Sequence, residues 1–242
     1  MSAKPPAAPG KSSSQPVTSK SESEDINAFL QAAKRVTPRA AGSGRLIFAM
    51  DATMSRQPTW DRACQLQGEM FQEAGSIGGL EIQLVYFRGF GECAASKWVS
   101  DGKALGGLMS RIDCRGGHTQ IRKVLTHAIK ETRRKKVQAM VYVGDCMEED
   151  VDELCAQAGE LGLLGVPAFI FQEGHEPVAE QAFREIARLT NGAFCRFDTA
   201  SARQLGELLR AVAAYAAGGM AALSDMDDRG GAGARLLLQQ LR

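Results

Sequence analysis

The chain has 242 residues, of which 44% are apolar and 24% are charged, a composition that predicts a packed core and excludes collagen-like, coiled-coil and wholly disordered chains. Its 29 basic and 28 acidic residues leave a formal net charge of +1, so no global field favours nucleic acid or an anionic membrane as a partner. No apolar run approaches the roughly 20 residues that span a bilayer, and the polar N-terminus lacks a signal peptide's apolar segment. We therefore expect a cytoplasmic protein.

The first 24 residues combine four of the eight prolines with serine, lysine and alanine, and they contain no aromatic residue. Such a segment buries too little apolar surface to offset the entropy of ordering, so we expect a disordered arm over residues 1–24. A short amphipathic helix is predicted over residues 25–36, before Pro38. Its apolar face would consist of Ile26, Phe29, Leu30 and Ala33. Residues 25–43 are therefore assigned to this helix and a linker.

From residue 44 onward, apolar runs of strand length alternate with segments that repeat apolar residues every three or four positions. Strands are predicted at residues 46–50, 80–88, 92–100, 137–144, 166–171 and 193–197. Helices are predicted around an apolar stripe at 63–74, at 101–112, from Ile121 through Ala128, and at 149–162, 178–190 and 201–217. Residues 89–91, with the sequence Gly-Phe-Gly, join the second and third strands into an antiparallel hairpin, which makes the third strand an edge.

Two of the predicted strands are apolar without interruption, at residues 139–143 and 166–170, as strands buried on both faces are. Strands that alternate with helices favour parallel pairing through right-handed crossovers. We therefore predict an α/β domain over residues 44–217. It would contain a doubly wound, mostly parallel six-stranded sheet with one antiparallel edge strand and helices on both faces.

The C-terminal region, residues 218–242, is rich in glycine. Glycines at 218, 219, 230, 231 and 233 predict a flexible linker over residues 218 to about 233. The segment that follows, residues 234–242, places Leu237, Leu238 and Leu241 on one helical face. Nine residues are too few for a stable isolated helix, so this segment docks on its own domain, docks in a partner's groove, or frays.

Residues with oxygen-bearing side chains lie at the ends of two predicted strands and at the start of a predicted helix. Asp51, Thr53 and Ser55 alternate along an extended segment, so they turn toward one side. Thr119 follows two glycines before a helix, and Asp145 ends an apolar strand. In an open α/β sheet, ligands bind beyond the carboxyl ends of strands where the strand order reverses. We therefore expect two carboxylates and three hydroxyls to converge there.

An all-oxygen set of donors suits a hard octahedral cation, Mg²⁺ or Mn²⁺, and lacks the thiolate or imidazole ligands that zinc prefers. Because only two of the five groups carry charge, a bound cation would still attract an acidic group from outside. The six cysteines, at 64, 93, 114, 146, 155 and 195, form no CxxC pair and are expected to be reduced, mostly buried thiols.

This arrangement resembles the von Willebrand factor A (VWA) domain with its metal-ion-dependent adhesion site (MIDAS). The family's Asp-x-Ser-x-Ser motif corresponds to Asp51, Thr53 and Ser55, its later threonine to Thr119, and its strand-terminal aspartate to Asp145. The resemblance implies a non-catalytic interaction module in which hydroxyls contact the metal, carboxylates often act through water, and the acidic side chain of a partner protein completes the octahedron. Thr53 replaces a serine of the motif, and Cys146 stands where a glycine is common.

Three other interpretations remain open. The motif residues suit turns and helix caps without any metal, and Glu148, Glu149, Asp150 and Asp152 suit the start of the next helix. A haloacid-dehalogenase-like, Mg²⁺-dependent phosphatase would use Asp51 as its nucleophile, but such chemistry calls for an acid/base carboxylate at position 53, which is threonine. The third interpretation is a scaffold domain that binds no metal.

Two further motifs are weak signals of function. Residues 42–44, Gly-Ser-Gly, precede a strand rather than follow one, so no dinucleotide cofactor is expected. The basic run at residues 133–136 lies at a predicted helix C-terminus, where cations complement exposed carbonyls, which favours a solvated face over a phosphate-binding patch.

Overall fold

The computed structural model of the chain describes residues 44–57, 80–100, 102–197 and 202–241, all of which belong to one compact unit, Ala41–Arg242. The arm predicted at residues 1–24, the helix and linker at 25–43, and the apolar stripe at 63–74 lie outside the described residues.

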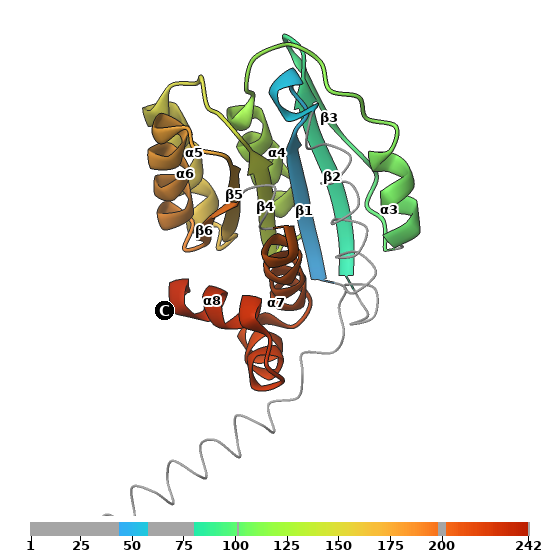
Figure 1. The fold of residues 1–242 in the computed structure, drawn as a ribbon, viewed down its shortest axis with the longest axis vertical. Helices are drawn as coiled ribbons and strands as arrows, with labels where there is room; N and C mark the ends of the chain where they lie inside the picture. The colour runs from blue at the N-terminus through green and yellow to red at the C-terminus, as the bar shows by residue number, and fades with distance from the viewer. Residues whose placement is uncertain (1–43, 58–79, 101, 198–201, 242) are drawn as a thin grey trace, which may run out of the picture. The chain divides into compact units, whose positions relative to one another are not determined.

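Six strands form one sheet: β1 (Gly44–Asp51), β2 (Leu80–Arg88), β3 (Glu92–Ala95), β4 (Ala139–Gly144), β5 (Ala168–Glu173) and β6 (Ala193–Phe197). Their order is β3-β2-β1-β4-β5-β6, with every neighbouring pair parallel except β2 and β3 (Figure 1). This is the predicted sheet, including its antiparallel edge strand. Chain order runs outward from β1 on both sides, so the order of the strands reverses between β1 and β4.

The edge strand β3 is shorter than predicted, ending at Ala95 rather than near residue 100. The reason is visible at Ser96, whose side-chain hydroxyl accepts a hydrogen bond from the backbone N–H of Leu84 at 3.0 Å. A side chain thereby takes the place of a backbone carbonyl and interrupts the ladder. Val99 rejoins β2 through an isolated bridge to Ile82.

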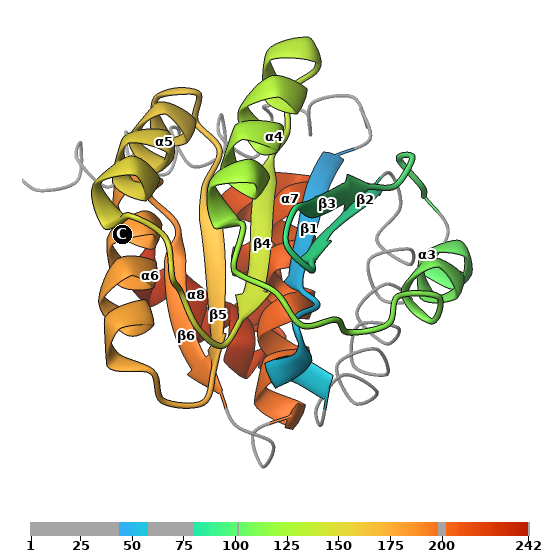
Figure 2. The same cartoon turned by 90° about the horizontal axis from the view of Figure 1, so that it is seen from above.

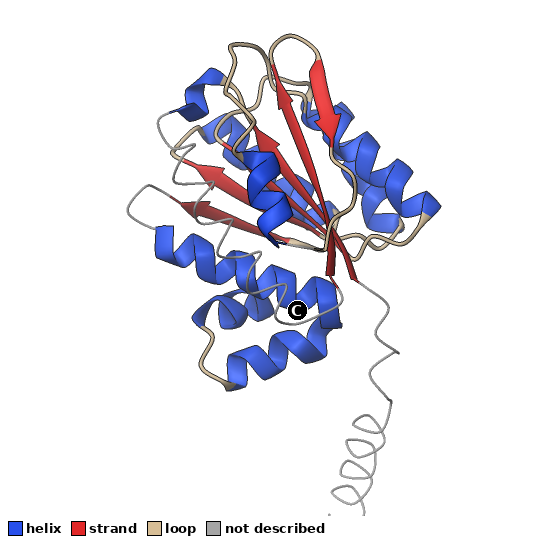
Figure 3. Ribbon diagram, turned by 90° about the vertical axis from the view of Figure 1, so that its right-hand side faces the viewer, coloured by secondary structure: helices blue, strands red, loops and turns tan. Residues whose placement is uncertain are grey.

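Helices cover both faces of the sheet, as predicted (Figures 2 and 3). They are η1 (Met54–Arg56, a short 3-10 helix), α3 (Gly102–Met109), α4 (Ile121–Arg134), α5 (Val151–Leu163), α6 (Pro177–Leu189), α7 (Ala202–Asp228) and α8 (Ala232–Gln240). Alternate residues of β1 enter two apolar clusters: Phe48 belongs to the cluster that includes residues of α3, α7 and α8, whereas Ile47 belongs to the cluster that includes residues of α4, α5 and α6. In the part of the chain described, no helix is both long and apolar enough to cross a membrane.

The glycine-rich segment predicted as a flexible linker is mostly helical. Helix α7 continues to Asp228 across a kink at Gly219, whose φ of 67° and ψ of −156° lie outside the helical region and are open to glycine because it has no Cβ. Leu223, beyond the kink, is fully buried. Burial of this apolar face against the rest of the domain outweighs the low helix propensity of glycine.

The C-terminal segment docks on its own domain, which was one of the three predicted outcomes. Helix α8 packs on α7. Leu237 is buried, and Leu238 and Leu241 are partly buried against the same apolar cluster, so these leucines share the predicted face. The docked neighbour supplies the stability that a nine-residue helix lacks by itself.

Candidate functional site

Asp51 and Asp145 leave the sheet at the same edge. Strands β1 and β4 are parallel neighbours, with Met50 opposite Val143, so their carboxyl ends lie together. This is also where the strand order reverses, which is the usual place for a ligand in an open α/β sheet. The topology therefore brings the two predicted carboxylates to one position.

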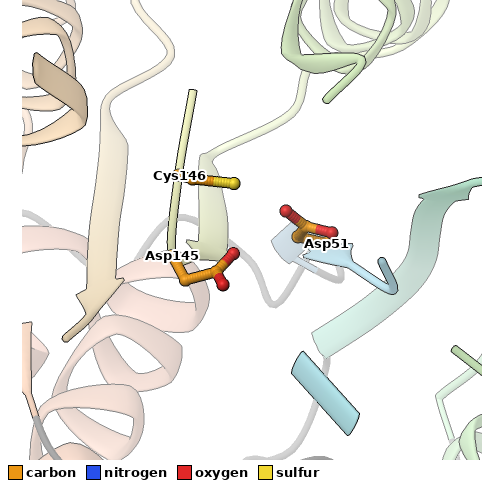
Figure 4. A group of neighbouring side chains, drawn as sticks. All are labelled: Asp51, Asp145 and Cys146. Carbon is orange, nitrogen blue, oxygen red and sulfur yellow. The ribbon is translucent and has the colours of Figure 1, made fainter. Parts of the chain in front are cut away.

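A carboxylate oxygen of Asp51, one of Asp145 and the sulfur of Cys146 all lie within 4.8 Å of one another. Figure 4 shows the three side chains pointing into the space between the ends of β1 and β4. Asp51 is fully buried, whereas Asp145 and Cys146 are partly exposed. These side chains thus form a group of potential ligands at the boundary between the core and the surface.

Within the described residues, one oxygen of each carboxylate has no hydrogen-bond partner. The Thr53 backbone N–H donates to Asp51 Oδ1 at 2.7 Å. This hydrogen bond forms the kind of turn expected if the motif residues serve turns rather than a metal. Asp51 Oδ2 and Asp145 Oδ1 are buried atoms with no hydrogen-bond partner among the described residues. Buried polar atoms are nearly always hydrogen-bonded, because desolvation without compensation is unfavourable. Turn chemistry therefore accounts for one oxygen of Asp51 and leaves the other unexplained.

The electrostatics of Asp51 reflect this burial. Desolvation raises the pKa of its carboxyl from the usual 3.8 to about 6, hydrogen bonding to Thr53 opposes the rise, and the charge of nearby Asp145 adds to it. At neutral pH the group is still mostly ionised, so it presents a poorly solvated negative charge to whatever enters the site.

The hydroxyls of Thr53 and Ser55 lie 3.0 Å apart, so these two side chains of the three-residue motif turn toward one another. Thr53 is buried and Ser55 is exposed. Thr53 directly precedes η1, but its side chain makes no capping hydrogen bond to that helix. The capping interpretation of Thr53 is therefore wrong.

Thr119 is tied to the loop that follows Asp145. Its hydroxyl accepts a hydrogen bond from the Glu148 backbone N–H at 3.0 Å, and its own N–H donates to the Glu148 carboxylate at 3.2 Å. The residue at the start of α4 is Gln120, and neither its side chain nor the Thr119 hydroxyl caps that helix. The predicted cap at Thr119 is thus not formed.

The acidic residues after Asp145 serve two different helices. Asp150 caps α5, accepting from the Glu153 N–H at 3.0 Å, so Asp145 is not the cap. Glu149 instead accepts from the backbone N–H groups of Ile121 and Arg122, the first residues of α4. Two adjacent acidic residues, Glu148 and Glu149, therefore fasten the segment that carries Thr119 to the loop that begins at Asp145.

Comparison with solved structures places this fold among known proteins. No protein-family model and no curated protein matches the chain. Among solved structures, a von Willebrand factor type A protein from Catenulispora acidiphila aligns with a TM-score of 0.59 at 16% identity, covering 73% of this chain and 43% of that one. The VWA domain of SpRpn10 aligns with a TM-score of 0.53 at 13% identity, covering 64% and 88%. The chain has a VWA-type fold.

A third structural neighbour, which aligns over nearly its whole length, is an aerotolerance-related membrane protein from Bacteroides fragilis. It aligns with a TM-score of 0.55 at 15% identity, covering 69% of this chain and 96% of that one. At such identities the likeness concerns the fold, so residue roles must come from the site itself. In this VWA-type fold, the predicted first motif, Thr119 and Asp145 all lie at the carboxyl edge of the sheet or are bonded to loops that do.

Sequence reasoning missed Cys146 as a member of the site. The expectation that the cysteines are mostly buried is wrong for the described ones, of which Cys114 alone is buried. Partial burial, followed by the charges of Asp145 and Asp51, raises the pKa of the Cys146 thiol to about 12. The metal-free protein therefore carries a neutral thiol beside two carboxylates. Its position directly after Asp145 was the available signal, but side-chain direction beyond the end of a strand does not follow from alternation.

Arg56 and Glu173 were also missed. Arg56 is almost completely buried, forms an ion pair with Glu173 at the end of β5, and its charge opposes the raised pKa of Asp51. A buried guanidinium beside Asp51 moderates the repulsion between the two aspartates. No sequence pattern distinguished Arg56 from an ordinary surface arginine.

The basic run at residues 133–136 faces protein groups. Arg133, Arg134 and Lys135 pair with Glu160, Glu131 and Glu81, and the Lys136 ammonium donates to the carbonyls of Leu164 and Gly165. The four residues are exposed and paired within the protein, which favours the predicted solvated face over a phosphate-binding patch.

The donors present fit a divalent cation. Two carboxylates converge from different strands, each with a buried oxygen that has no hydrogen-bond partner among the described residues, and neutral hydroxyls lie in the adjoining turn. Carboxylate, hydroxyl and water oxygens are the ligands that Mg²⁺ and Mn²⁺ prefer. Asp51 and Asp145 would hold such a cation, with Thr53, Ser55 and Thr119 as the predicted hydroxyl donors.

Proposed function

We propose that this chain is a non-catalytic protein-interaction module, acting in the cytoplasm, that binds a divalent cation and uses it to engage an acidic side chain of a partner protein. Asp51 and Asp145 hold the cation, and Mg²⁺ or Mn²⁺ is expected from the oxygen donors. The observation that carries this proposal is a pair of buried carboxylate oxygens, Asp51 Oδ2 and Asp145 Oδ1, at the edge where the strand order reverses, neither of which has a hydrogen-bond partner in the described ranges.

The chemistry of the donors supports an external acidic ligand. A cation held by two carboxylates has its charge balanced, but octahedral Mg²⁺ needs six ligands, and the hydroxyls of Thr53, Ser55 and Thr119 add no negative charge. Asp145 and Ser55 are not fully buried, so the site opens toward solvent. A carboxylate from another molecule can therefore replace a water ligand and form the strongest remaining bond.

Exposed side chains beside the predicted ligands suit a protein partner. Met54 follows Thr53 and is 55% exposed, and His118 precedes Thr119 with 67% of its side chain exposed. Phe90 is 84% exposed and packs edge-on against the His118 ring, with ring centroids 5.3 Å apart. Aromatic residues and methionine are enriched in protein interfaces, so these groups would contact a partner whose acidic residue reaches the cation.

Calorimetric titration with Mg²⁺ and with Mn²⁺ tests the cation site. Wild-type protein should bind one equivalent of either ion, Asp51→Asn should lose this binding, and Asp152→Asn should keep it. Asp152 is a matched control because it is an exposed aspartate in the first turn of α5. Equal binding by wild type and Asp51→Asn would contradict the site assignment.

Selection from a random peptide library tests the mode of interaction. Peptides selected in the presence of Mg²⁺ should share an Asp or Glu, should lose binding when EDTA is added, and should lose it when that residue becomes Asn or Gln. Peptides that bind equally well in EDTA would contradict a cation-bridged contact. Metal-dependent hydrolysis of p-nitrophenyl phosphate that disappears in Asp51→Asn would instead establish the phosphatase alternative.

A further inference from the structure

The position of Cys146 at the candidate site suggests a different metal preference from that of an all-oxygen site. Its sulfur lies within 4.8 Å of carboxylate oxygens of both Asp51 and Asp145. Consecutive residues of a strand point to opposite faces, but β4 ends at Gly144, and beyond it both Asp145 and Cys146 turn toward Asp51 (Figure 4). Among the described residues, these three side chains form the one group of ligands of this kind.

We propose that Cys146 is a third ligand of this site and makes it select thiophilic divalent cations, Zn²⁺ and its spectroscopic substitute Co²⁺, over Mg²⁺. This inference rests on the proposed function, because it concerns the same site and adds the class of cation that the site prefers. It also goes beyond the oxygen-only donor set expected from the sequence.

The second observation that points to a ligand is Asp51 itself. Its side chain is fully buried, its Oδ2 has no hydrogen-bond partner in the described part of the chain, and it faces the sulfur and Asp145. A cysteine beside satisfied neighbours would carry no such implication. Here the carboxylate that carries the unpartnered oxygen and the sulfur of Cys146 face the same small volume.

The ligand chemistry decides which cation this volume favours. Zn²⁺ bonds cysteine sulfur at about 2.3 Å and carboxylate oxygen at about 2.0–2.2 Å, commonly in tetrahedral sites where three protein ligands leave a fourth position open. Mg²⁺ instead demands near-ideal octahedral oxygen ligation and gains little from sulfur. Two carboxylates and one thiolate therefore suit Zn²⁺, and the open position remains available for a partner's carboxylate.

Metal binding at this site is a simple exchange. The Cys146 S–H bond breaks, its proton passes to the buffer, and a metal–sulfur bond forms, with no change in the oxidation state of metal or sulfur. Asp51 and Asp145 supply two negative charges, which match the two positive charges of the cation, and the Cys146 thiolate adds a third.

Co²⁺ absorption spectroscopy of the full chain tests this inference, because a thiolate bound to Co²⁺ gives a charge-transfer band in the near ultraviolet. Wild-type protein should show the band on addition of Co²⁺, and Zn²⁺ should abolish it by competition. Cys146→Ser should lack the band, whereas Cys93→Ser should retain it. Cys93 is the control because it is also a partly buried free thiol but lies in β3.

Affinities measured by competition complete the test. Cys146→Ser should weaken Zn²⁺ binding by at least the roughly 10–100-fold that follows loss of even an outer-shell partner, while changing Mg²⁺ binding much less. Cys146→Ala, checked by far-ultraviolet circular dichroism, replaces the serine variant if the latter does not fold. A Co²⁺ band that is absent from wild type, or that persists in both Cys146 variants, overturns the inference.

The two proposals fail in different ways. If Mg²⁺ binds through Asp51 but no thiolate band depends on Cys146, this inference is wrong and the proposed function stands. If neither Mg²⁺ nor Co²⁺ binds the wild-type protein, the proposed cation site itself is wrong, and the inference falls with it.

Discussion

Asp51 and Asp145, at the ends of the neighbouring parallel strands β1 and β4, bring carboxylate oxygens within 4.8 Å of each other. Each carboxylate has a buried oxygen without a hydrogen-bond partner in the described part of the chain. Two like charges that are poorly solvated and close together destabilise the metal-free fold. A proton or a cation between them relieves this destabilisation, and the first prediction follows from that balance.

Asp51→Asn should stabilise the metal-free protein at neutral pH. The pKa of the Asp51 carboxyl is about 6 in the folded protein and about 3.8 in the unfolded protein. Between these two pH values, the folded state therefore holds a proton that the unfolded state has already lost. The stability contributed by Asp51 therefore falls as pH rises from about 4 to 6. The difference between the two pKa values corresponds to a loss of about 3 kcal/mol of unfolding free energy above pH 6. Asp51→Asn should regain part of this loss, because asparagine carries no charge.

Urea denaturation in EDTA at pH 4 to 8 measures this effect. The difference in unfolding free energy between Asp51→Asn and wild type should grow in favour of the variant as pH rises through this window and level off above it. Curves that stay parallel across the window would show that Asp51 is not the buried, perturbed carboxyl that the structure indicates.

Arg56→Met should destabilise the protein at neutral pH by about 3–5 kcal/mol, because it removes the buried ion pair with Glu173. The double variant Arg56→Met with Glu173→Gln should be less destabilised than the sum of the two single variants. Chemical denaturation of the four proteins measures the coupling. Additive effects would contradict a direct interaction between the two side chains.

Glu149→Ala should loosen the start of α4. The carboxylate accepts from the backbone N–H groups of Ile121 and Arg122 at 2.5 and 3.0 Å, so its loss should cost about 0.5–2 kcal/mol, as for the loss of a helix cap. Glu153→Ala is the control, since that glutamate forms only an exposed ion pair with Arg122.

Amide hydrogen exchange locates the effect of Glu149→Ala. Exchange of the Ile121 and Arg122 amides should accelerate in this variant and change little in Glu153→Ala. Similar exchange in both variants would mean that Glu149 does not cap α4.

Tyr142→Phe should leave stability unchanged or raise it slightly. The Tyr142 hydroxyl is buried and has no hydrogen-bond partner among the described residues, so removing it relieves a desolvated group. Gly144→Ala should be destabilising by about 1–3 kcal/mol, because an added Cβ would clash with that hydroxyl oxygen. Combining the two changes should recover part of the loss, and thermal unfolding of all four proteins measures it. A fully additive double variant would contradict this contact.

The fold follows from the sequence where the pattern of apolar residues is strong. The uninterrupted runs that became β4 and β5 predicted buried parallel strands, and the glycine-flanked turn before β3 predicted the antiparallel edge. The early end of β3 was not predicted, because it depends on where the Ser96 hydroxyl bonds. The helix beyond Gly219 was not predicted either. The local glycine content indicated a linker, and the tertiary contact that stabilises the helix exists only in the folded domain.

For the site, strand topology explains what could be foreseen. The meeting of Asp51 and Asp145 follows from their places at the ends of strands on either side of the reversal in strand order. The part played by Cys146 depends on backbone direction after β4 ends, and that of Arg56 on a pairing between η1 and β5. Neither leaves a local pattern in the sequence.

Anomalous diffraction from crystals grown with Mn²⁺ tests the central claim most directly, because it locates the ion itself. The account predicts a single strong peak between β1 and β4, at about 2.0–2.3 Å from an oxygen of Asp51, of Asp145, or of a water bridging them. A peak bound only elsewhere, or none while the two carboxylates keep their present arrangement, would contradict it.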